Sequence, residues 1–284
     1  MKRENELIIG LGEVGKSLQQ VLDCDGYDFK GSAVKREKYE VLHICFPIDE
    51  KQQSFFQDVC MYALCFLPDH IVIHSTVPVG MTRAIRGYLR DELPKIVNNV
   101  TVTHSPIRGL HPHLTESIRH FVKYYGGPNA EEIAMRYEDE FEIPNFKCTF
   151  SSETTEALKL WSTTAFGWSI IFEKAVHDFC ERNNVDFNIV YTHATQSYNA
   201  GYKVMGQAHF VRPVLDHMGG KIGGHCVISN AGMLEDTLAR VLTAFNDTMY
   251  SRHVSEHSVK GLQMLWTAQE GVTELEEVKD DDDC

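Results

Sequence analysis

The sequence predicts an α/β fold in which a doubly wound parallel sheet is followed by an all-helical region. Short apolar runs alternate with helical patterns from residue 7 to residue 150, which is typical of parallel strands joined by helices. A glycine-rich turn closes the first of these runs. From residue 151 the pattern is helical, with no further strand signal. We therefore expect two domains, residues 1–150 and 151–270, followed by an acidic tail at 271–284.

The composition of the 284 residues is that of a soluble globular protein, with 43% hydrophobic and 24% charged residues. The net charge of −13 argues against nucleic acid or an anionic membrane as a partner. No apolar run is long enough to cross a bilayer, and the N-terminus lacks the apolar core of a signal peptide. The cysteines are scattered, so we expect reduced thiols, no metal site and a cytoplasmic protein. The tail ends in Asp280–Asp283 and is expected to be disordered.

The first strand and its turn form the most informative stretch of the chain. Leu7–Ile9 reads as a buried strand that runs into G-x-G-x-x-G at Gly10, Gly12 and Gly15. Gly10 permits a tight turn, Gly12 lets a pyrophosphate approach the backbone, and Gly15 lets the next helix pack closely. That helix would point its free N–H groups and its positive end at the phosphates. The alternative interpretation is an ordinary glycine-rich turn.

Further residues extend the predicted dinucleotide site. Asp28 lies about where a Rossmann unit places the acid that binds the adenosine ribose, although a turn aspartate is the alternative. Lys35 and Arg36 could instead meet a 2′-phosphate, so we expect NAD and do not exclude NADP. Later strands end at small or rigid residues that would lie over the ligand crevice. The predicted cofactor residues are Gly10, Gly12, Glu13, Val14, Gly15, Asp28, Pro47, Ser75 and Thr76.

The helical region is dominated by one long predicted helix from Glu153 to Asn183, and further helices are expected at 187–198 and 232–265. The long helix carries large aromatic side chains on more than one side, including Trp161, Trp168 and Phe172. This is more apolar surface than a two-domain monomer would leave in water, so we expect a homodimer.

Several stretches together resemble the UDP-glucose/GDP-mannose 6-dehydrogenase family, in the family's order along the chain. They are Gly10–Gly15, Ser75–Thr82, Ser105-Pro106, Gly126-Gly127, Thr155–Leu160, Cys180-Glu181 and Gly223–Val227. The resemblance implies a Rossmann NAD domain, a helical dimerisation domain and a small-molecule substrate such as a sugar or nucleotide sugar. Its primary alcohol would be oxidised in two hydride steps. It also implies a shortened member, since the family's nucleotide-gripping domain would not fit in the residues after Cys226.

The resemblance assigns roles to individual residues. Cys226 matches the nucleophile that holds the aldehyde as a thiohemiacetal and then as a thioester. Lys159 matches the lysine that stabilises developing oxyanion charge, and Thr76 matches a threonine at the cofactor. Gly223 and Gly224 would let the chain approach the sugar. On residue chemistry alone, Cys226 could instead be a buried structural thiol and Lys159 a solvated helix lysine.

Three positions depart from the family pattern. Ile107 and Asn230 stand where the family carries acids, and Thr163 stands where it carries asparagine. Because the acid replaced by Asn230 helps to activate water, we expect thioester formation to outrun thioester hydrolysis. The predicted substrate-binding residues are Thr163, Gly223, Gly224 and Asn230.

Two other functions stay open: a two-electron 3-hydroxyacid-type dehydrogenase that uses Lys159 without Cys226, and a non-catalytic dinucleotide-binding protein. His104, at the end of a strand, is a reserve candidate for acid–base work.

Overall fold

The computed structural model describes residues 3–28, 34–48, 52–93, 100–137, 146–224 and 226–249. They form two compact units. The first runs to Thr163 and includes Met233–Glu235, and the second holds the remaining described residues from Thr164 onward. The division falls inside a single long helix, whereas the predicted boundary near residue 150 falls just before that helix begins. The predicted acidic tail lies outside the described residues.

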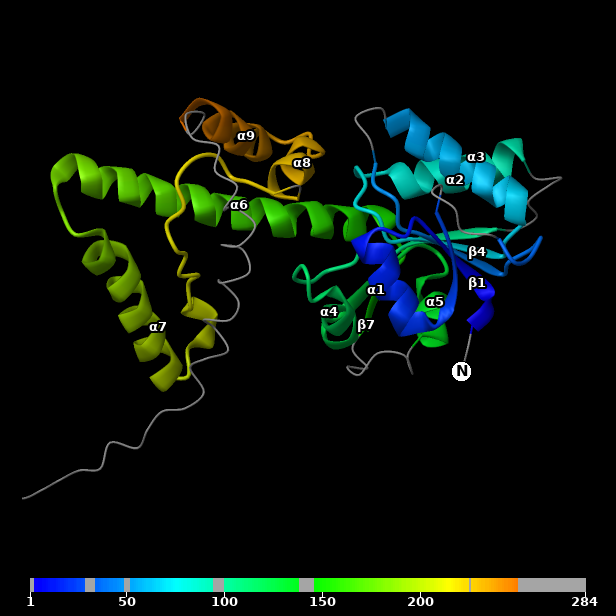
Figure 1. Cartoon of the computed structure of the whole chain (residues 1–284), viewed down its shortest axis with the longest axis horizontal. Coiled ribbons are helices and arrows are strands. Elements are labelled where there is room, and N and C mark those ends of the chain that lie inside the picture. Colours follow the sequence, from blue (N-terminus) through cyan, green and yellow to red (C-terminus); the bar gives the residue numbers. More distant parts are fainter. Residues whose placement is uncertain are drawn as a thin grey trace, which may run out of the picture. The chain divides into compact units, whose positions relative to one another are not determined.

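The first unit is built on a seven-stranded sheet (Figure 1). Its strands are β1 Arg3–Ile9, β2 Cys24–Tyr27, β3 Val41–Ile44, β4 His70–Ile73, β5 Thr101–His104, β6 Lys123–Gly126 and β7 Phe146–Thr149. The spatial order is β2-β1-β3-β4-β5-β6-β7, so the strand order reverses between β1 and β3. In doubly wound sheets this switch point, at the carboxyl ends of the strands, is where ligands bind.

One pairing departs from the expected parallel sheet. All neighbouring strands from β2 to β5 are parallel, but β6 pairs with β5 in the antiparallel direction, and β7 runs parallel to β6. The mostly parallel, doubly wound fold is confirmed, with two reversed strands at one edge. The short helix α4 Leu114–His120, which precedes β6, is a further element that the sequence pattern did not predict.

Helices cover both faces of this sheet (Figure 1). They are α1 Glu13–Leu22, α2 Gln52–Phe66, α3 Met81–Glu92, α4, α5 Ala130–Arg136 and the start of α6 Ser152–Asn183. Alternate residues of β1 serve different layers: Leu7 and Ile9 pack with α2 and α3, whereas Ile8 packs with α1, α4 and α5. Strands buried on both faces explain the continuous apolar runs of the sequence.

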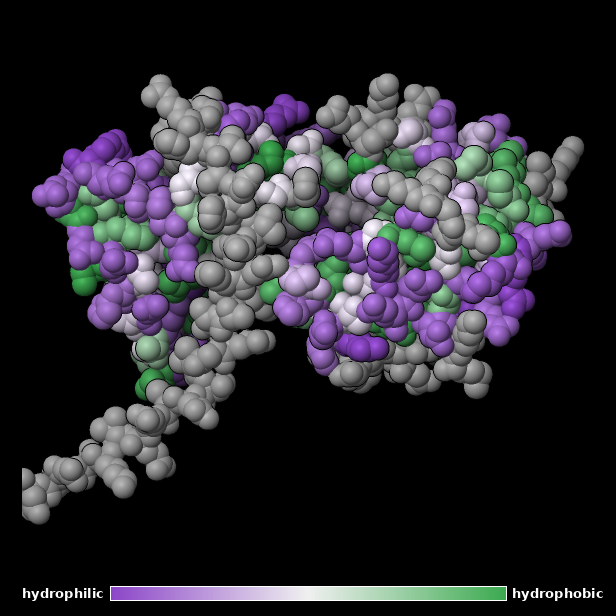
Figure 2. Space-filling view, in the orientation of Figure 1, coloured by the Kyte–Doolittle hydropathy of each residue, from purple (hydrophilic) through white to green (hydrophobic). Residues whose placement is uncertain are grey.

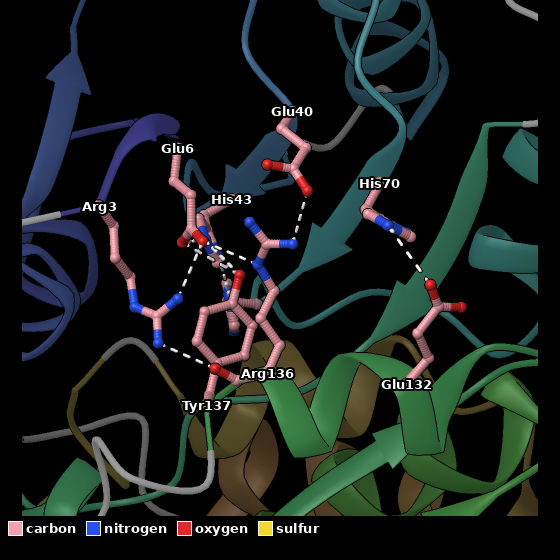
Figure 3. A network of polar contacts seen from close by, with 9 residues as sticks. Arg3, Glu6, Glu40, His43, His70, Glu132, Arg136 and Tyr137 are labelled. Carbon is pink, nitrogen blue, oxygen red and sulfur yellow. Dashed lines mark hydrogen bonds and ion pairs between the residues drawn. The ribbon is translucent and has the colours of Figure 1, made fainter.

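A buried polar network crosses the sheet at β1 and β3 (Figure 3). The carboxylate of Glu6 accepts hydrogen bonds from Arg136 Nε at 2.9 Å and Arg3 at 3.2 Å, and it lies 3.2 Å from His43 Nε2. His43 Nδ1 lies 3.0 Å from Nε2 of His74. Burial alone would raise the pKa of Glu6, but His43 and the two arginines outweigh burial and lower it to about 2. Glu6 is therefore an ionised carboxylate inside the protein.

Glu6→Gln is expected to destabilise the fold by about 3 kcal/mol at pH 7, because it leaves the guanidinium groups of Arg3 and Arg136, which are 18% and 27% exposed, without the buried carboxylate. A carboxyl whose pKa is depressed stabilises the folded state above its unfolded pKa of 4.5, and this contribution is lost as pH falls towards 2. Urea unfolding of the variant should therefore depend less on pH between 4.5 and 2 than unfolding of the wild type. Glu4→Gln is the control, since Glu4 is 60% exposed in its pair with Arg36. Equal effects of the two substitutions would contradict the buried-network account.

The second unit is helical. It holds the rest of α6, a π-helical turn Asn188–His193, α7 Ala194–Val204, a 3₁₀ turn Ala208–Phe210, α8 Val227–Gly232 and α9 Thr237–Met249. A Cβ on Gly167 of α6 would lie 2.6 Å from Val227 and 2.9 Å from Leu242, so this glycine lets α8 and α9 approach α6 closely. None of the described helices has the length and apolar character needed to cross a bilayer.

The helix predicted for residues 232–265 is partly wrong. In the structure α8 ends at Gly232, and α9 begins only at Thr237. The carboxylate of Asp236 accepts a hydrogen bond from the N–H of Leu238 at 2.8 Å, which is the geometry of a helix N-cap. The remainder of the predicted helix, beyond Met249, lies outside the described residues. The helices expected at 153–183 and 187–198 are both present.

Candidate active site

The glycine turn has the geometry that a dinucleotide site requires. Gly10 has a φ of +94°, and a Cβ there would lie 2.6 Å from the backbone N of Phe46, which follows β3. A Cβ on Gly15 would lie 1.9 Å from the carbonyl O of Gly10. Around Gly12, by contrast, an added Cβ would meet nothing within 4 Å. Gly10 and Gly15 are therefore needed by the fold, and Gly12 leaves open space at the start of α1.

The other predicted cofactor residues of the first helix surround this opening. Glu13 is exposed, and its carboxylate lies 2.7 Å from Nδ1 of His111. Val14 is half-buried and packs against the cluster beneath α1. Pro47 is exposed, directly after the Phe46 backbone that Gly10 contacts. The turn after β1 and the segment after β3 thus lie together at the switch point of the sheet.

Asp28 lies at the same turn. It follows the last residue of β2, and its carboxylate accepts a hydrogen bond from the backbone N–H of Leu11 at 3.2 Å. The two basic residues weighed for a 2′-phosphate have acidic partners: Lys35 pairs with Asp25 at 2.6 Å, and Arg36 pairs with Glu4 at 2.6 Å. Asp28 is thus the residue directly after β2, and the described bases nearby are held in ion pairs.

The segment after β4 is fixed from two sides. The hydroxyl of Ser75 donates to the carbonyl of Phe46 at 2.6 Å, and Thr76 next to it is half-buried. The N–H groups of Gly80 and Thr82, at the start of α3, donate to the carboxylate of Glu156 at 2.6 and 2.9 Å. Glu156 comes from α6 and is fully buried. The sequence pattern gave no sign of this contact, because an acid near the start of a helix normally faces solvent.

Lys159 points towards the carboxyl end of β5. Its Nζ donates to the carbonyl of Ile107 at 2.8 Å. Thr163, one turn later, donates its hydroxyl to the carbonyls of Leu160 at 3.0 Å and Lys159 at 3.3 Å. The structure therefore places the lysine at the edge of the sheet where the glycine turn lies.

His104 does not suit the acid–base role kept in reserve for it. It is fully buried, with Nδ1 2.8 Å from the hydroxyl of Thr155 and Nε2 3.3 Å from the carbonyl of Ser75. Burial lowers its pKa to about 3. Without access to a ligand, this neutral imidazole serves as a link between β5, α6 and the segment after β4.

Cys226 belongs to the second unit, where it is exposed directly before α8. Its carbonyl accepts the N–H of Asn230 at 3.0 Å, and Asn230 itself is 5% exposed. Gly224, before it, has a φ of +80°, and Gly223 is half-buried. Among the described cysteines only Cys65 is also exposed. Cys226 is thus accessible to a reagent, unlike a core thiol.

One further group of possible ligands lies on α6. His177, Asp178 and Glu181 bring ligand atoms within 4.8 Å of one another. All three come from one helix, and Glu181 is exposed. This group is smaller than the enclosed four-ligand set of a structural zinc site.

No family model and no curated protein matches the sequence. Solved structures match its fold. UDP-D-ManNAc dehydrogenase from Pyrococcus horikoshii has a TM-score of 0.68 at 18% identity, over 86% of this chain and 68% of that chain. UDP-N-acetyl-mannosamine dehydrogenase from Staphylococcus aureus has a TM-score of 0.65 at 18% identity, with the same coverage. 3-Hydroxyisobutyrate dehydrogenase from Mycobacterium tuberculosis has a TM-score of 0.62 at 13% identity, over 93% of this chain and 99% of that chain. The chain therefore has the fold that these dehydrogenases share.

Proposed function

We propose that the protein is an NAD-dependent dehydrogenase that oxidises an alcohol, in the first instance a sugar-like one, with Cys226 as nucleophile. The observation that carries the proposal is the turn after β1, where Gly12 faces open space and the Asp28 carboxylate lies beside the turn. Such a turn leaves room for a pyrophosphate, and the Asp28 carboxylate would accept hydrogen bonds from ribose hydroxyls. The ion pairs of Lys35 and Arg36 favour NAD over NADP, because neither base is left to meet a 2′-phosphate.

The proposed binding residues divide between cofactor and substrate. The cofactor would be held by Gly10, Gly12, Glu13, Val14, Gly15, Asp28, Pro47, Ser75 and Thr76. The substrate would be held by Thr163, Gly223, Gly224 and Asn230. NAD, when bound, accepts the hydride from the alcohol carbon. A helix N-terminus and an uncluttered backbone at Gly12 supply the phosphate contacts.

The proposed chemistry uses two side chains. Lys159 stabilises the negative charge that develops on the substrate oxygen as its proton leaves. Cys226 attacks the resulting aldehyde as a thiolate, so that sulfur bonds to carbon and the oxygen takes up a proton. Loss of a second hydride, to a second molecule of NAD, and of the hydroxyl proton converts this thiohemiacetal into a thioester, and water then releases the acid and restores the thiol. Since Ile107 and Asn230 carry no acid, the last step is expected to be slow.

A second candidate is a hydroxyacid dehydrogenase that needs Lys159 but not Cys226. The fold likeness to 3-hydroxyisobutyrate dehydrogenase extends over 99% of that chain, which favours keeping this candidate. A single hydride step needs no thioester hydrolysis and therefore no acid at Ile107 or Asn230. The third candidate, a protein that binds the dinucleotide without catalysis, would show ligand binding alone.

A two-stage experiment separates these functions. Thermal unfolding with NAD, NADP, sugars, nucleotide sugars and hydroxyacids identifies ligands, since a ligand at 100 times its Kd adds about 2.7 kcal/mol of stability. NADH formation is then measured with each stabilising alcohol. Turnover that is lost in Cys226→Ser supports the covalent mechanism, and turnover that survives in it supports the hydroxyacid type. Binding of NAD without turnover of any alcohol would contradict both dehydrogenase proposals.

We also propose a homodimer formed through the helical unit. Phe172 and Phe179 are seven residues apart on α6, so they share a face, and they are 63% and 52% exposed. Apolar surface also lies at the exposed end of α7 (Figure 2). Large apolar side chains exposed on one face of a helix are typical of a contact region.

Light scattering is expected to give about twice the 32.3 kDa subunit mass for the wild type. The double variant Phe172→Asp/Phe179→Asp should give the mass of one subunit, because two carboxylates would be buried in the contact. Phe150→Asp is the control, since Phe150 is 84% exposed but lies in the sheet unit. A wild-type mass near 32 kDa at micromolar concentration would rule out this dimer.

A further inference from the structure

Side chains hold three consecutive carbonyls in the segment after β5. The carbonyl of Ser105 accepts from His74 Nδ1 at 2.7 Å and from Lys123 Nζ at 3.2 Å. Lys123 Nζ also lies 3.5 Å from the carbonyl of Pro106. The next carbonyl, that of Ile107, accepts from Lys159. The backbone acceptor that fixes Lys159 is therefore one residue beyond the acceptors that Lys123 fixes.

Lys123 is an unusual residue for this position. It lies on β6 and is only 6% exposed. Burial lowers its pKa to about 7. The titratable groups that face it are Cys45 after β3, His74 after β4, His104 of β5 and Lys159 of α6.

Such a lysine costs folding stability. An ammonium group loses its hydration when it is buried, and a folded-state pKa near 7 against the ordinary 10.5 means that the folded chain holds the proton less tightly. Stability therefore rises with pH between about 7 and 10.5, where the unfolded chain binds more protons. An apolar side chain at 123 would avoid this cost. Because the lysine lowers the stability of the fold, we look for its role in the contacts that it makes with the carbonyls of Ser105 and Pro106.

We propose that Lys123 is a positioning residue: by holding the carbonyls of Ser105 and Pro106 it fixes the Ile107 carbonyl on which Lys159 rests. The proposal deepens the function proposed above, because it rests on Lys159 as the group that meets the substrate oxygen. His74 holds the same Ser105 carbonyl from the other side and is itself in contact with His43. The segment is thus set by the core of the sheet.

The test variant is Lys123→Met, which keeps most of the length of the side chain and removes the N–H donors of the lysine. It is expected to fold and to unfold at a higher temperature than the wild type at pH 6, because a buried charge is gone. Competitive labelling with acetic anhydride, read by peptide mass spectrometry, then reports the reactivity of Lys159 without any turnover. In the wild type this reactivity, relative to the exposed Lys147, should change in a step near pH 7 as Lys123 loses its proton. In Lys123→Met the step should disappear.

The control is Lys203→Met, which removes an exposed lysine of α7, keeps Lys147 as the reference and should leave the step in place. If the step persists in Lys123→Met, or if Lys159 is equally reactive in Lys123→Met and in the wild type at every pH, the positioning role is wrong. The two proposals can fail separately. If the protein never forms NADH but shows the step, the proposed dehydrogenase activity is wrong and the positioning role of Lys123 still stands. Where a substrate is found, Lys123→Met should lower kcat by about tenfold with KM and the Kd for NAD unchanged. An unchanged kcat would overturn the proposal even if NADH is formed.

Discussion

Replacing Gly12 with valine is expected to raise the Kd for NAD by at least about 100-fold, or ~2.8 kcal/mol, while the protein stays folded. The backbone of Gly12 has a φ of −72°, which any residue adopts, and a Cβ there meets nothing within 4 Å. The new side chain would therefore fit the protein and occupy the space proposed for the pyrophosphate. Calorimetry with NAD measures the affinity, and urea unfolding measures the stability.

Two other glycines serve as controls for this variant. Gly87 of α3 also has open space around an added Cβ, so Gly87→Val should leave the affinity for NAD unchanged. Gly15→Val should fail to fold, because its Cβ would lie 1.9 Å from the carbonyl O of Gly10. Wild-type affinity for NAD in a folded Gly12→Val variant would remove the dinucleotide site from this turn.

Cys226 is expected to react with iodoacetamide at least about tenfold faster than Cys65 at pH 7, because a nucleophile works as its thiolate. Cys65 is the matched control, since it is exposed as well but lies on α2, outside the proposed site. The core thiols should not react in the folded protein: burial raises the pKa of Cys45 to about 12 and that of Cys60 to about 11. Bound NAD should change the rate at Cys226 and leave the rate at Cys65 unchanged.

The same cysteine should leave a kinetic signature. With a suitable aldehyde, NADH is expected to appear as a burst of at most about one equivalent per subunit, followed by slow turnover. Asn230→Asp should speed the slow phase by supplying an acid, and its stability must be measured alongside because Asn230 is buried. Equal labelling of Cys226 and Cys65, with or without NAD, would remove the covalent mechanism. The hydroxyacid dehydrogenase would then be the better account.

Local rules predicted the parts of this protein in which a short stretch decides its own structure. The strand β1, its glycine turn and α1 follow from an apolar run, three glycines and a helical period, and all three are confirmed. The long helix α6 could also be predicted, because its helical pattern runs unbroken from Ser152 to Asn183. Secondary structure could be read this way because each signal lies within a few residues.

Features that depend on distant partners could not be read. β6 pairs with β5 in the antiparallel direction, and the hydrophobic pattern of a short strand does not show in which direction it pairs. Lys123 and Glu6 look like surface residues in the sequence, and only partners far along the chain show that they are buried and bonded. The substrate-binding role of Thr163 and Asn230 stays a prediction for the same reason.

The contact of Glu156 with the start of α3 decides how much of the chain must accompany this sheet when it is joined to another protein. A fragment cut at residue 150 would leave the N–H groups of Gly80 and Thr82 without their carboxylate and His104 without Thr155. Each lost hydrogen bond to the Glu156 carboxylate is worth about 1.5–3 kcal/mol, which is a large share of the stability of a single domain. The first three turns of α6 are therefore part of the unit that has to be kept together with the sheet. A recombination or gene fusion that preserves the folded sheet unit has to carry the chain to about Thr163.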